Sequence, residues 1–242
     1  MSTWFENFMA DFDLNFIQGD RWKILLSGLG NTLLITVLAG LMGIAIGVVI
    51  AMVRSTYDKT AEGARKTVGR FLFSVADRIC RIYLTIFRGT PVVVQLLIIY
   101  LVIFAWSDNG TMVAALAFGL NSGAYVAEII RGGIMSIDNG QFEAGRSLGF
   151  NYMQTMRFII IPQTIKNVLP SLANEFIALL KETSVAGYVA VRDLTKAGDI
   201  IRSRTYSPFL PLLAVALIYL VLVMFFSWLV SKLERRLRNN DH

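Results

Sequence analysis

The chain has 242 residues, of which 55% are hydrophobic and 17% charged, with a net charge of +6 at pH 7. The apolar residues lie in long uninterrupted runs, which indicates one integral membrane domain rather than a soluble one. In a membrane protein, a net positive charge indicates cytoplasmic loops and contacts with anionic lipid headgroups rather than binding of nucleic acid. The single cysteine, Cys80, excludes an intrachain disulfide and a cysteine-based metal cluster, and the single histidine, His242, leaves no basis for a histidine-centred site.

The first element is an acidic, aromatic arm at residues 1–22. It lacks the basic region, apolar core and small-residue cleavage site of a secretory signal, so we expect it to be retained. Apolar segments follow, each close to the roughly 20 residues that a helix needs to cross hydrocarbon. They are residues 23–53, 82–104, 112–130, 159–180 and 209–230. We predict an all-α integral membrane protein whose five transmembrane helices form one domain within residues 23–230.

The placement of lysine and arginine predicts the orientation. Basic residues crowd segment 54–81 and the tail at 231–242, whereas the N-terminal arm is acidic. The positive-inside rule then puts the N-terminus outside, the C-terminus in the cytoplasm and the loop 132–157 inside. The connector 182–207 disagrees, because this orientation puts it outside although it is basic. Loops near the first helix usually dominate topology, so we keep the assignment.

The first two spans carry small residues and a break. Ala39, Gly43, Gly47 and Ala51 recur every four residues, a stripe that lets another helix approach closely, for packing or for motion.

In the second span, Gly89 loosens the helix, and Pro91 cannot donate a hydrogen bond to the carbonyl four residues earlier, so we predict a helix break at Gly89 and Pro91. Such backbone is tolerated at depth only against protein or a water-filled cavity. Arg88 lies within the same span, so its charge must reach the headgroups, pair with an acidic residue or face a cavity.

Polar residues mark the next two spans. Asn121, Tyr125 and Glu128 share one face of the third span, and Arg131 can pair with Glu128 one turn away. The fourth span carries a polar or small stripe with Glu175 beside it, and a carboxylate at mid-bilayer costs about 2.5–3.5 kcal/mol or more. Helix–helix hydrogen bonding is one explanation; we favour a polar solute pathway. Its predicted residues are Asn121, Asn174, Glu175, Gln95 and Thr90.

Patterns for catalysis are missing from the sequence. It contains no G-x-x-x-x-G-K-[ST], no H-E-x-x-H and no G-x-S-x-G, and it has no carboxylate–histidine set. We therefore predict a non-enzymatic chain that holds no cofactor or metal of its own.

The loop between the third and fourth spans carries the most specific pattern. It reads Glu143-Ala144-Gly145, three residues, Gly149, nine residues, then Ile-Ile-Ile-Pro at 159–162. This resembles the EAA loop of the membrane subunits of ABC importers, with Gly145 in place of the second alanine and Ile161 in place of a leucine. "FRGTPVVVQ", "GAYVAEIIRGGIMSIDNGQ" and "LKETSVAG" are similar to the polar amino acid permease branch, so the resemblance covers residues 31–194.

The resemblance implies a type I importer fold and a set of partners. These are a second permease subunit, identical or related, two cytoplasmic ATPase subunits that bind ATP and Mg²⁺, and an extracytoplasmic amino acid-binding protein or domain. The loop would form a short coupling helix in a groove of the ATPase, with Glu143, Ala144, Gly145, Arg146 and Gly149 as its residues. From the residues themselves, Ala144 and Gly145 keep one side thin for docking, and Gly149 can end the helix with a positive φ.

Two further expectations concern the connector 182–207 and the basic tail at 231–242. The connector 182–207 is either an outer scaffold or a contact for the binding protein, and the basic tail is expected at anionic lipid. The alternatives to an ATP-driven importer in a prokaryotic cytoplasmic membrane are a secondary transporter or channel, and a membrane enzyme. Five spans without an inverted repeat disfavour many secondary transporters.

Overall fold

The computed structural model describes residues 2–60 and 68–239, which form helices and short connections with no strand in those ranges. Arg65 and Lys66 of the predicted cytoplasmic segment lie outside the described residues. So do the last three residues of the predicted basic tail, His242 among them.

The N-terminal arm is helical. It forms α1 (Ser2–Phe12), a π-helical turn η1 (Asp13–Ile17) and a short η2 (Gln18–Asp20) before α2 (Trp22–Thr60) begins. The chain redirects at Gly19, whose φ of +65° lies in the left-handed region that glycine adopts without strain. Phe16 is buried, which ties the arm to the core described below.

Several helices are suited to a membrane. Among the described residues, three are long and apolar enough to cross one: Trp22–Asp58 in α2, Gly110–Met135 as α5, and Phe209–Arg236 in α10 (Phe209–Asn239). Gly69–Gly89 and Val92–Ile103 would add a fourth if they form one broken span. The predicted fourth span forms helix α8 (Ile161–Glu182), but its polar positions lower its hydropathy and leave it outside this group. The all-helical class agrees with the prediction, and the count of five spans stays a prediction.

The chain packs into two compact units. The first unit consists of Met1–Ala39, Val92–Phe118 and Ile177–Trp228, and the second of Gly40–Pro91, Gly119–Phe176 and Leu229–His242.

In the first unit, the core forms around α9 (Leu194–Thr205), which buries Leu194, Ala197 and Ile201 against apolar side chains of α2 and α10. α4 (Val92–Ile98), the π-helical η3 (Ile99–Ile103) and η5 (Thr183–Val189) belong to this unit as well.

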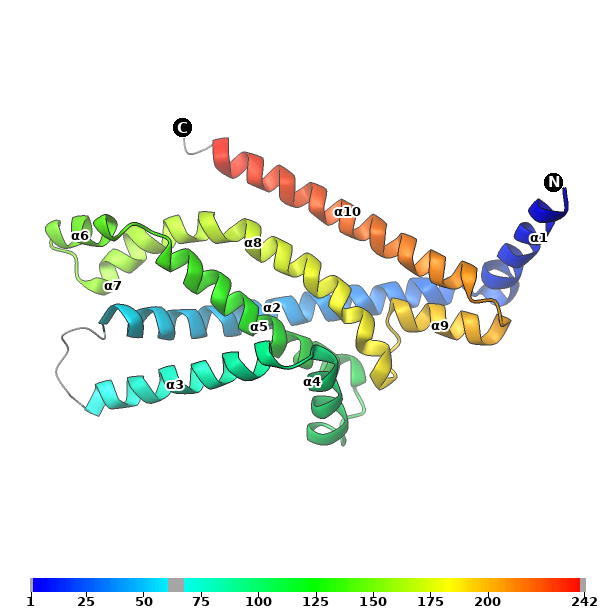
Figure 1. Ribbon diagram of the computed structural model, residues 1–242, viewed down its shortest axis with the longest axis horizontal. Coiled ribbons are helices and arrows are strands. Elements are labelled where there is room, and N and C mark those ends of the chain that lie inside the picture. Colours follow the sequence, from blue (N-terminus) through cyan, green and yellow to red (C-terminus); the bar gives the residue numbers. More distant parts are fainter. Residues whose placement is uncertain (1, 61–67, 240–242) are drawn as a thin grey trace. The chain divides into compact units, whose positions relative to one another are not determined.

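In the second unit, the later part of α2 packs with α3 (Val68–Gly89) and α5, and Figure 1 shows α3 running beside that part of α2. The small-residue stripe lies at this contact. A Cβ added to Gly43 would stand 3.0 Å from Ser122, and one added to Gly47 would stand 2.4 Å from Val126. The predicted close helix approach is therefore confirmed, since any larger residue at these two positions would clash with α5.

A smaller core positions the loop that follows α5. Ile134 near the end of α5 and Ile137 just after it pack on Met156 and Ile160 of the π-helical η4 (Met156–Ile160). Between them lie α6 (Asn139–Ser147) and the short α7 (Tyr152–Thr155), in the green to yellow-green part of the chain in Figure 1. The loop is thus an ordered helical element attached to the second unit.

Candidate functional site

The helix α6 in the predicted coupling loop begins at a defined cap. The Asp138 side chain accepts a hydrogen bond of 2.6 Å from the backbone N–H of Gly140, as an N-cap aspartate does. Glu143, Ala144 and Arg146 are all exposed on the helix that follows. α6 therefore presents one carboxylate and one guanidinium to a partner from a fixed backbone.

The end of α6 is equally well defined. The Gly149 N–H donates to the Arg146 carbonyl at 2.9 Å, and the Phe150 N–H donates to the Gly145 carbonyl at 3.0 Å. This pair of bonds is the Schellman arrangement, which needs a left-handed residue just after the helix. Gly149 supplies it with φ of +79°, in agreement with the predicted helix end.

Gly145 lies on the side of α6 that faces the rest of the chain. It is buried, and a Cβ at this position would lie 2.7 Å from the hydroxyl oxygen of Thr155. The missing side chain therefore lets α6 approach the segment that returns to α8, within the same chain. Ala144 is exposed, so its small side chain leaves room for a docked partner. The missing side chain of Gly145 instead leaves room for a segment of the same chain.

A shallow pocket of about 230 Å³ opens beside α6. It is lined by Asn139, Phe142, Glu143, Arg146 and Tyr152. The Phe142 and Tyr152 rings are nearly parallel, with centroids 6.5 Å apart, and burial raises the pKa of the Tyr152 hydroxyl. The pocket therefore combines an aromatic floor with the two exposed charges of α6, which suits a side chain from a docked protein.

The predicted helix break lies between α3 and α4. α3 ends at Gly89, α4 begins at Val92, and Pro91 leaves the carbonyl of Phe87 without its helical donor. The side-chain amide of Asn121 donates to this carbonyl at 3.1 Å, and the Thr90 hydroxyl donates to Ile86 at 2.8 Å. Asn121, expected in a solute pathway, is 3% exposed and supports the broken backbone.

The other predicted pathway residues fall at different places. Glu175 is half-buried on α8 and accepts a 2.9 Å hydrogen bond from the Ser122 hydroxyl, while Asn174 is exposed. Gln95 is buried in the first unit. The sequence analysis missed Ser122, although it adjoins Asn121 and its hydroxyl is a natural partner for a buried carboxylate.

A charged cluster joins α2, α3 and α5 in the second unit. Glu128 accepts a 3.1 Å bond from Arg54 and lies 3.7 Å from both Arg88 and Arg131. The predicted pair of Glu128 and Arg131 is therefore confirmed, and it belongs to a larger set.

Two aspartates complete this cluster. Asp77 lies 2.7 Å from Arg81 and 3.7 Å from Arg54, and Asp58 lies 3.3 Å from Arg131 and 3.8 Å from Arg81. The sequence analysis missed all of these pairs, although Asp77 and Arg81 lie one helical turn apart on α3; the other partners are far apart along the chain. No group of three or more metal-ligating side chains occurs among the described residues.

The basic connector 182–207 is folded into the first unit. The Thr32 hydroxyl accepts from the backbone of Leu194 at 2.9 Å, and the Asn31 amide donates to the carbonyl of Arg192. The N-cap of α9 is Asp193, which is fully buried and accepts from the Thr195 and Lys196 N–H groups. Burial raises the pKa of the Asp193 carboxyl, although these two bonds oppose the shift. Half of the connector is thus a scaffold anchored on α2.

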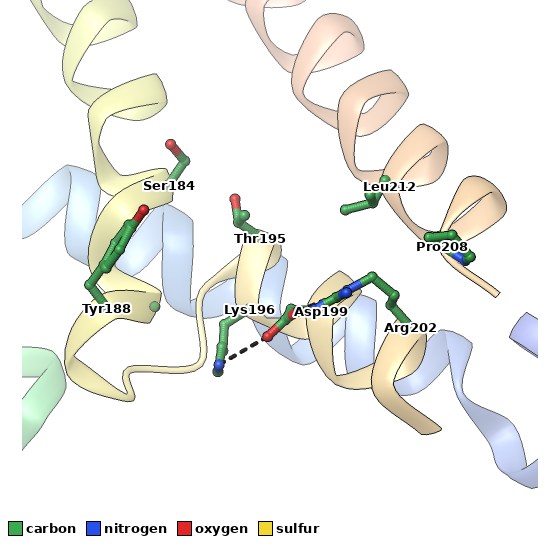
Figure 2. Close-up of a pocket in the computed structure, with 9 residues that line it drawn as sticks. Ser184, Tyr188, Thr195, Lys196, Asp199, Arg202, Pro208 and Leu212 are labelled. Atoms are coloured by element: carbon green, nitrogen blue, oxygen red, sulfur yellow. Dashed lines mark hydrogen bonds and ion pairs between the residues drawn. The ribbon is translucent and has the colours of Figure 1, made fainter. Parts of the chain in front are cut away.

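Three charged residues of this connector pair with one another on α9. Asp199 lies 3.0 Å from Lys196 and 2.5 Å from Arg202, and these pairs lower the pKa of its carboxyl. Figure 2 shows Lys196 and Asp199 joined on α9, in a pocket of about 480 Å³ that also contains Tyr188 and Leu212. The connector still disagrees with the positive-inside rule, because that rule counts lysine and arginine whether or not they are paired.

Comparisons with known proteins agree on one family. Residues 61–239 match the family described as binding-protein-dependent transport system inner membrane component. The chain is 38% identical over 209 residues to a putative glutamine transport system permease protein GlnP of Rickettsia bellii, covering 85% of this chain and 89% of that protein. It is 34% identical over 220 residues to the arginine transport system permease protein ArtQ of Bacillus subtilis, covering 90% and 94%.

A solved structure is similar as well. It is described as a crystal structure of an amino acid ABC transporter with histidines. The chain superposes on it with a TM-score of 0.77 and 41% identity, over 88% of this chain and 94% of that one.

Proposed function

Because the chain belongs to the family of inner membrane components of binding-protein-dependent transport systems, we propose that it is the permease subunit of an ATP-driven importer of polar amino acids. The relatives named for glutamine and arginine transport, and the similar amino acid transporter structure, support an amino acid as the cargo. The observation that carries the proposal is α6, a capped helix with exposed charges between two membrane helices.

The topology of the proposal follows from charge placement. Residues 1–242 form one transmembrane domain with five spans in a prokaryotic cytoplasmic membrane. The arm 1–22 lies outside, and the loop 132–157 and the tail 231–242 lie in the cytoplasm. α8 is then the fourth span, and its polar positions face protein or water.

Coupling to ATP hydrolysis takes place at α6. In the proposed complex, the α6 helices of two permease subunits, identical or related, dock on a cytoplasmic ATPase dimer that binds ATP and Mg²⁺. Glu143 and Arg146 supply charged contacts, and the pocket at Phe142 accepts a side chain of the partner. The chain itself performs no catalysis. Closure of the ATPase dimer moves α6 together with the ends of α5 and η4, because their apolar side chains form one small core.

The solute pathway is proposed along α8. Glu175 and Asn174 offer a carboxylate and an amide, groups that can bind the ammonium and carboxylate of a free amino acid. Gln95 and Thr90 remain proposed members. Asn121 contributes by holding the broken helix end at Phe87 in place.

Delivery of the amino acid is the role of an extracytoplasmic binding protein or domain. In the proposed orientation it meets the outer ends of the helices, where α9 forms a rigid platform anchored on α2.

Reconstitution tests the proposed function. The chain is placed in lipid vesicles with its cognate ATPase and binding protein, and ATP hydrolysis is measured while single amino acids are added. We expect a polar amino acid to stimulate hydrolysis and to accumulate inside. Uptake by the chain without any ATPase would instead support a secondary transporter or channel.

A variant tests the proposed pathway in the same vesicles. Glu175→Gln keeps the shape of the side chain and removes its charge, so we expect a changed transport rate or amino acid selectivity. An unchanged transport profile would remove Glu175 from the pathway.

A further inference from the structure

An arginine-lined cleft in the second unit has no part in the proposed transport mechanism. It has a volume of about 580 Å³ and lies beside the end of α3. Among the described residues, its charged lining consists of Arg54, Arg81, Arg88, Arg131 and Glu128. Four guanidinium groups thus face one carboxylate across a space large enough for a small ligand.

The charges of this arginine cleft do not balance. Glu128 is shared by three arginines, and only its contact with Arg54, at 3.1 Å, has hydrogen-bond length. Asp58 and Asp77 pair with the arginines from outside the lining, so the described cluster still has an excess of one positive charge. Four planar donor groups in one place favour an oxyanion, since guanidinium and phosphate or carboxylate oxygens match in geometry.

Two arginines of the cleft have a buried Nε atom, and each of these atoms lies 3.7 Å from a carboxylate oxygen of the cluster. Among the described residues, the buried Nε atoms of Arg54 and Arg131 make no hydrogen bond. A buried donor on a charged group carries a free-energy penalty when it makes no hydrogen bond. The negative potential of an anion in the cleft would lower this penalty.

The cleft is open to a ligand. The side chain of Arg81 is 52% exposed and that of Arg88 is 45% exposed, whereas Arg54 is 13% exposed. No heavy atom lies within 4 Å of the position that a Cβ would take on Gly89, at the rim. The Arg88 guanidinium lies over the Tyr125 ring, 5.8 Å from its centroid, which holds it near the mouth.

The position along the helices suggests the source of the anion. Arg54 and Asp58 lie at the end of the apolar span of α2, and Glu128 and Arg131 lie near the end of the apolar span of α5. The two span ends meet, since Arg131 lies 3.3 Å from Asp58. If α2 and α5 cross a bilayer, this end of the cleft lies near the phosphate groups of one leaflet.

We propose that the arginine cleft binds a singly charged phosphate-type oxyanion, with the headgroup of an anionic phospholipid as its source. The ligand bridges Arg88 and Arg81 at the mouth and neutralises the excess charge of the cluster. This inference requires that α2 and α5 cross a membrane, and it holds whether or not the chain transports amino acids.

The test compares lipids and variants on the purified full-length chain. Native mass spectrometry measures the retention of phosphatidylglycerol and of phosphatidylcholine, and thermal unfolding is followed with and without inorganic phosphate. The variants are Arg88→Gln and Arg81→Gln, with Arg88→Lys retaining the charge. Arg78→Gln is the control, because it removes the same charge from an exposed position of α3 that does not line the cleft.

We expect the unmodified chain to retain phosphatidylglycerol in preference to phosphatidylcholine. Arg88→Gln should weaken that preference by about fivefold, the effect of one arginine at a headgroup, and Arg78→Gln should leave it within about twofold. Stabilisation by inorganic phosphate without a lipid preference, lost in Arg88→Gln, would support the oxyanion site with a soluble source and exclude the lipid. Equal retention of both lipids together with no phosphate effect in the unmodified chain would overturn the proposal without any variant. An equal loss in Arg78→Gln would also overturn it.

Discussion

Two charged connectors join long helices in this chain, and they differ in what their charges contact. In the connector 182–207, Lys196 and Arg202 pair with Asp199, and α9 buries Leu194 and Ile201 in a core. In α6, Gly145 is buried, while Glu143 and Arg146 are exposed.

The difference separates a scaffold from a docking element. Ion pairs within one exposed helix contribute little to binding or stability, and they leave fewer charges for a partner. Exposed charges on a helix with fixed ends keep their full potential for a partner and need little reorganisation when it binds. Sequence charge alone does not make this distinction, because both connectors carry acidic and basic residues.

The largest expected effect tests α6. Glu143→Ala should lower ATP-driven uptake by about tenfold or more, because a charged contact to the ATPase is lost while the helix remains formed. Uptake and ATP hydrolysis are measured together in vesicles, where hydrolysis should persist without uptake. Glu234→Ala, which removes an exposed carboxylate from α10, is the matched control. Normal uptake in Glu143→Ala would indicate that α6, like the connector 182–207, is a scaffold and not a docking element.

The next effect concerns the inward side of α6. Gly145→Ala places a Cβ 2.7 Å from the Thr155 side chain, so we expect a loss of about 1–3 kcal/mol from overpacking. Thermal unfolding in detergent should show a transition temperature lower by about 2–4 °C per kcal/mol. Adding Thr155→Ala should recover part of the loss, and Gly132→Ala, with no atom within 4 Å of its Cβ position, serves as the control. Equal behaviour of Gly145→Ala and Gly132→Ala would contradict the packing.

A third change tests the scaffold. Asp193→Ala removes the buried N-cap of α9 and should lower stability by about 1–2 kcal/mol, seen in thermal unfolding, with little change in uptake per folded chain.

The acidity of Asp193 adds a dependence on pH. Because burial raises the pKa of its carboxyl in the folded chain, the unfolded chain loses the proton first, and stability falls as pH rises through the raised pKa. Asp193→Asn keeps an acceptor oxygen and should lose this dependence. The same dependence of stability on pH in the unmodified chain and in Asp193→Asn would show that Asp193 is not its source.

The smallest expected effect is at the surface of α9. Arg202→Gln breaks a pair whose side chains are 48% and 34% exposed, so we expect a change in stability below about 0.5 kcal/mol and uptake within about twofold. Affinity for the binding protein is measured in parallel. A large loss of that affinity would show that the scaffold is also a docking surface.

Local backbone features of the fold were predictable from the sequence. The positive φ of Gly149 and the break at Pro91 depend on single residue types whose backbone preferences are strong. The small-residue stripe at Gly43 and Gly47 depends on spacing along one helix. Such features need no knowledge of distant partners, and the sequence analysis found them.

Features that join distant segments were not predictable. Which side of α6 faces the chain depends on Thr155, and a helix of nine residues has too weak a pattern to show it. The bonds from Asn121 to Phe87 and from Arg131 to Asp58 span 34 and 73 residues, and no spacing rule links them. A polar residue in an apolar helix predicts that a partner exists without saying which one it is.

The bond between Asn121 and Phe87 makes the side chains at positions 91 and 121 depend on each other. The amide of Asn121 donates to the carbonyl that a backbone N–H at position 91 would otherwise reach, so the energetic effects of substitutions at the two positions should not add. A backbone N–H at position 91 would compete with Asn121 for this carbonyl, so the loss of Asn121 should cost more stability while Pro91 is present than after Pro91 has been replaced.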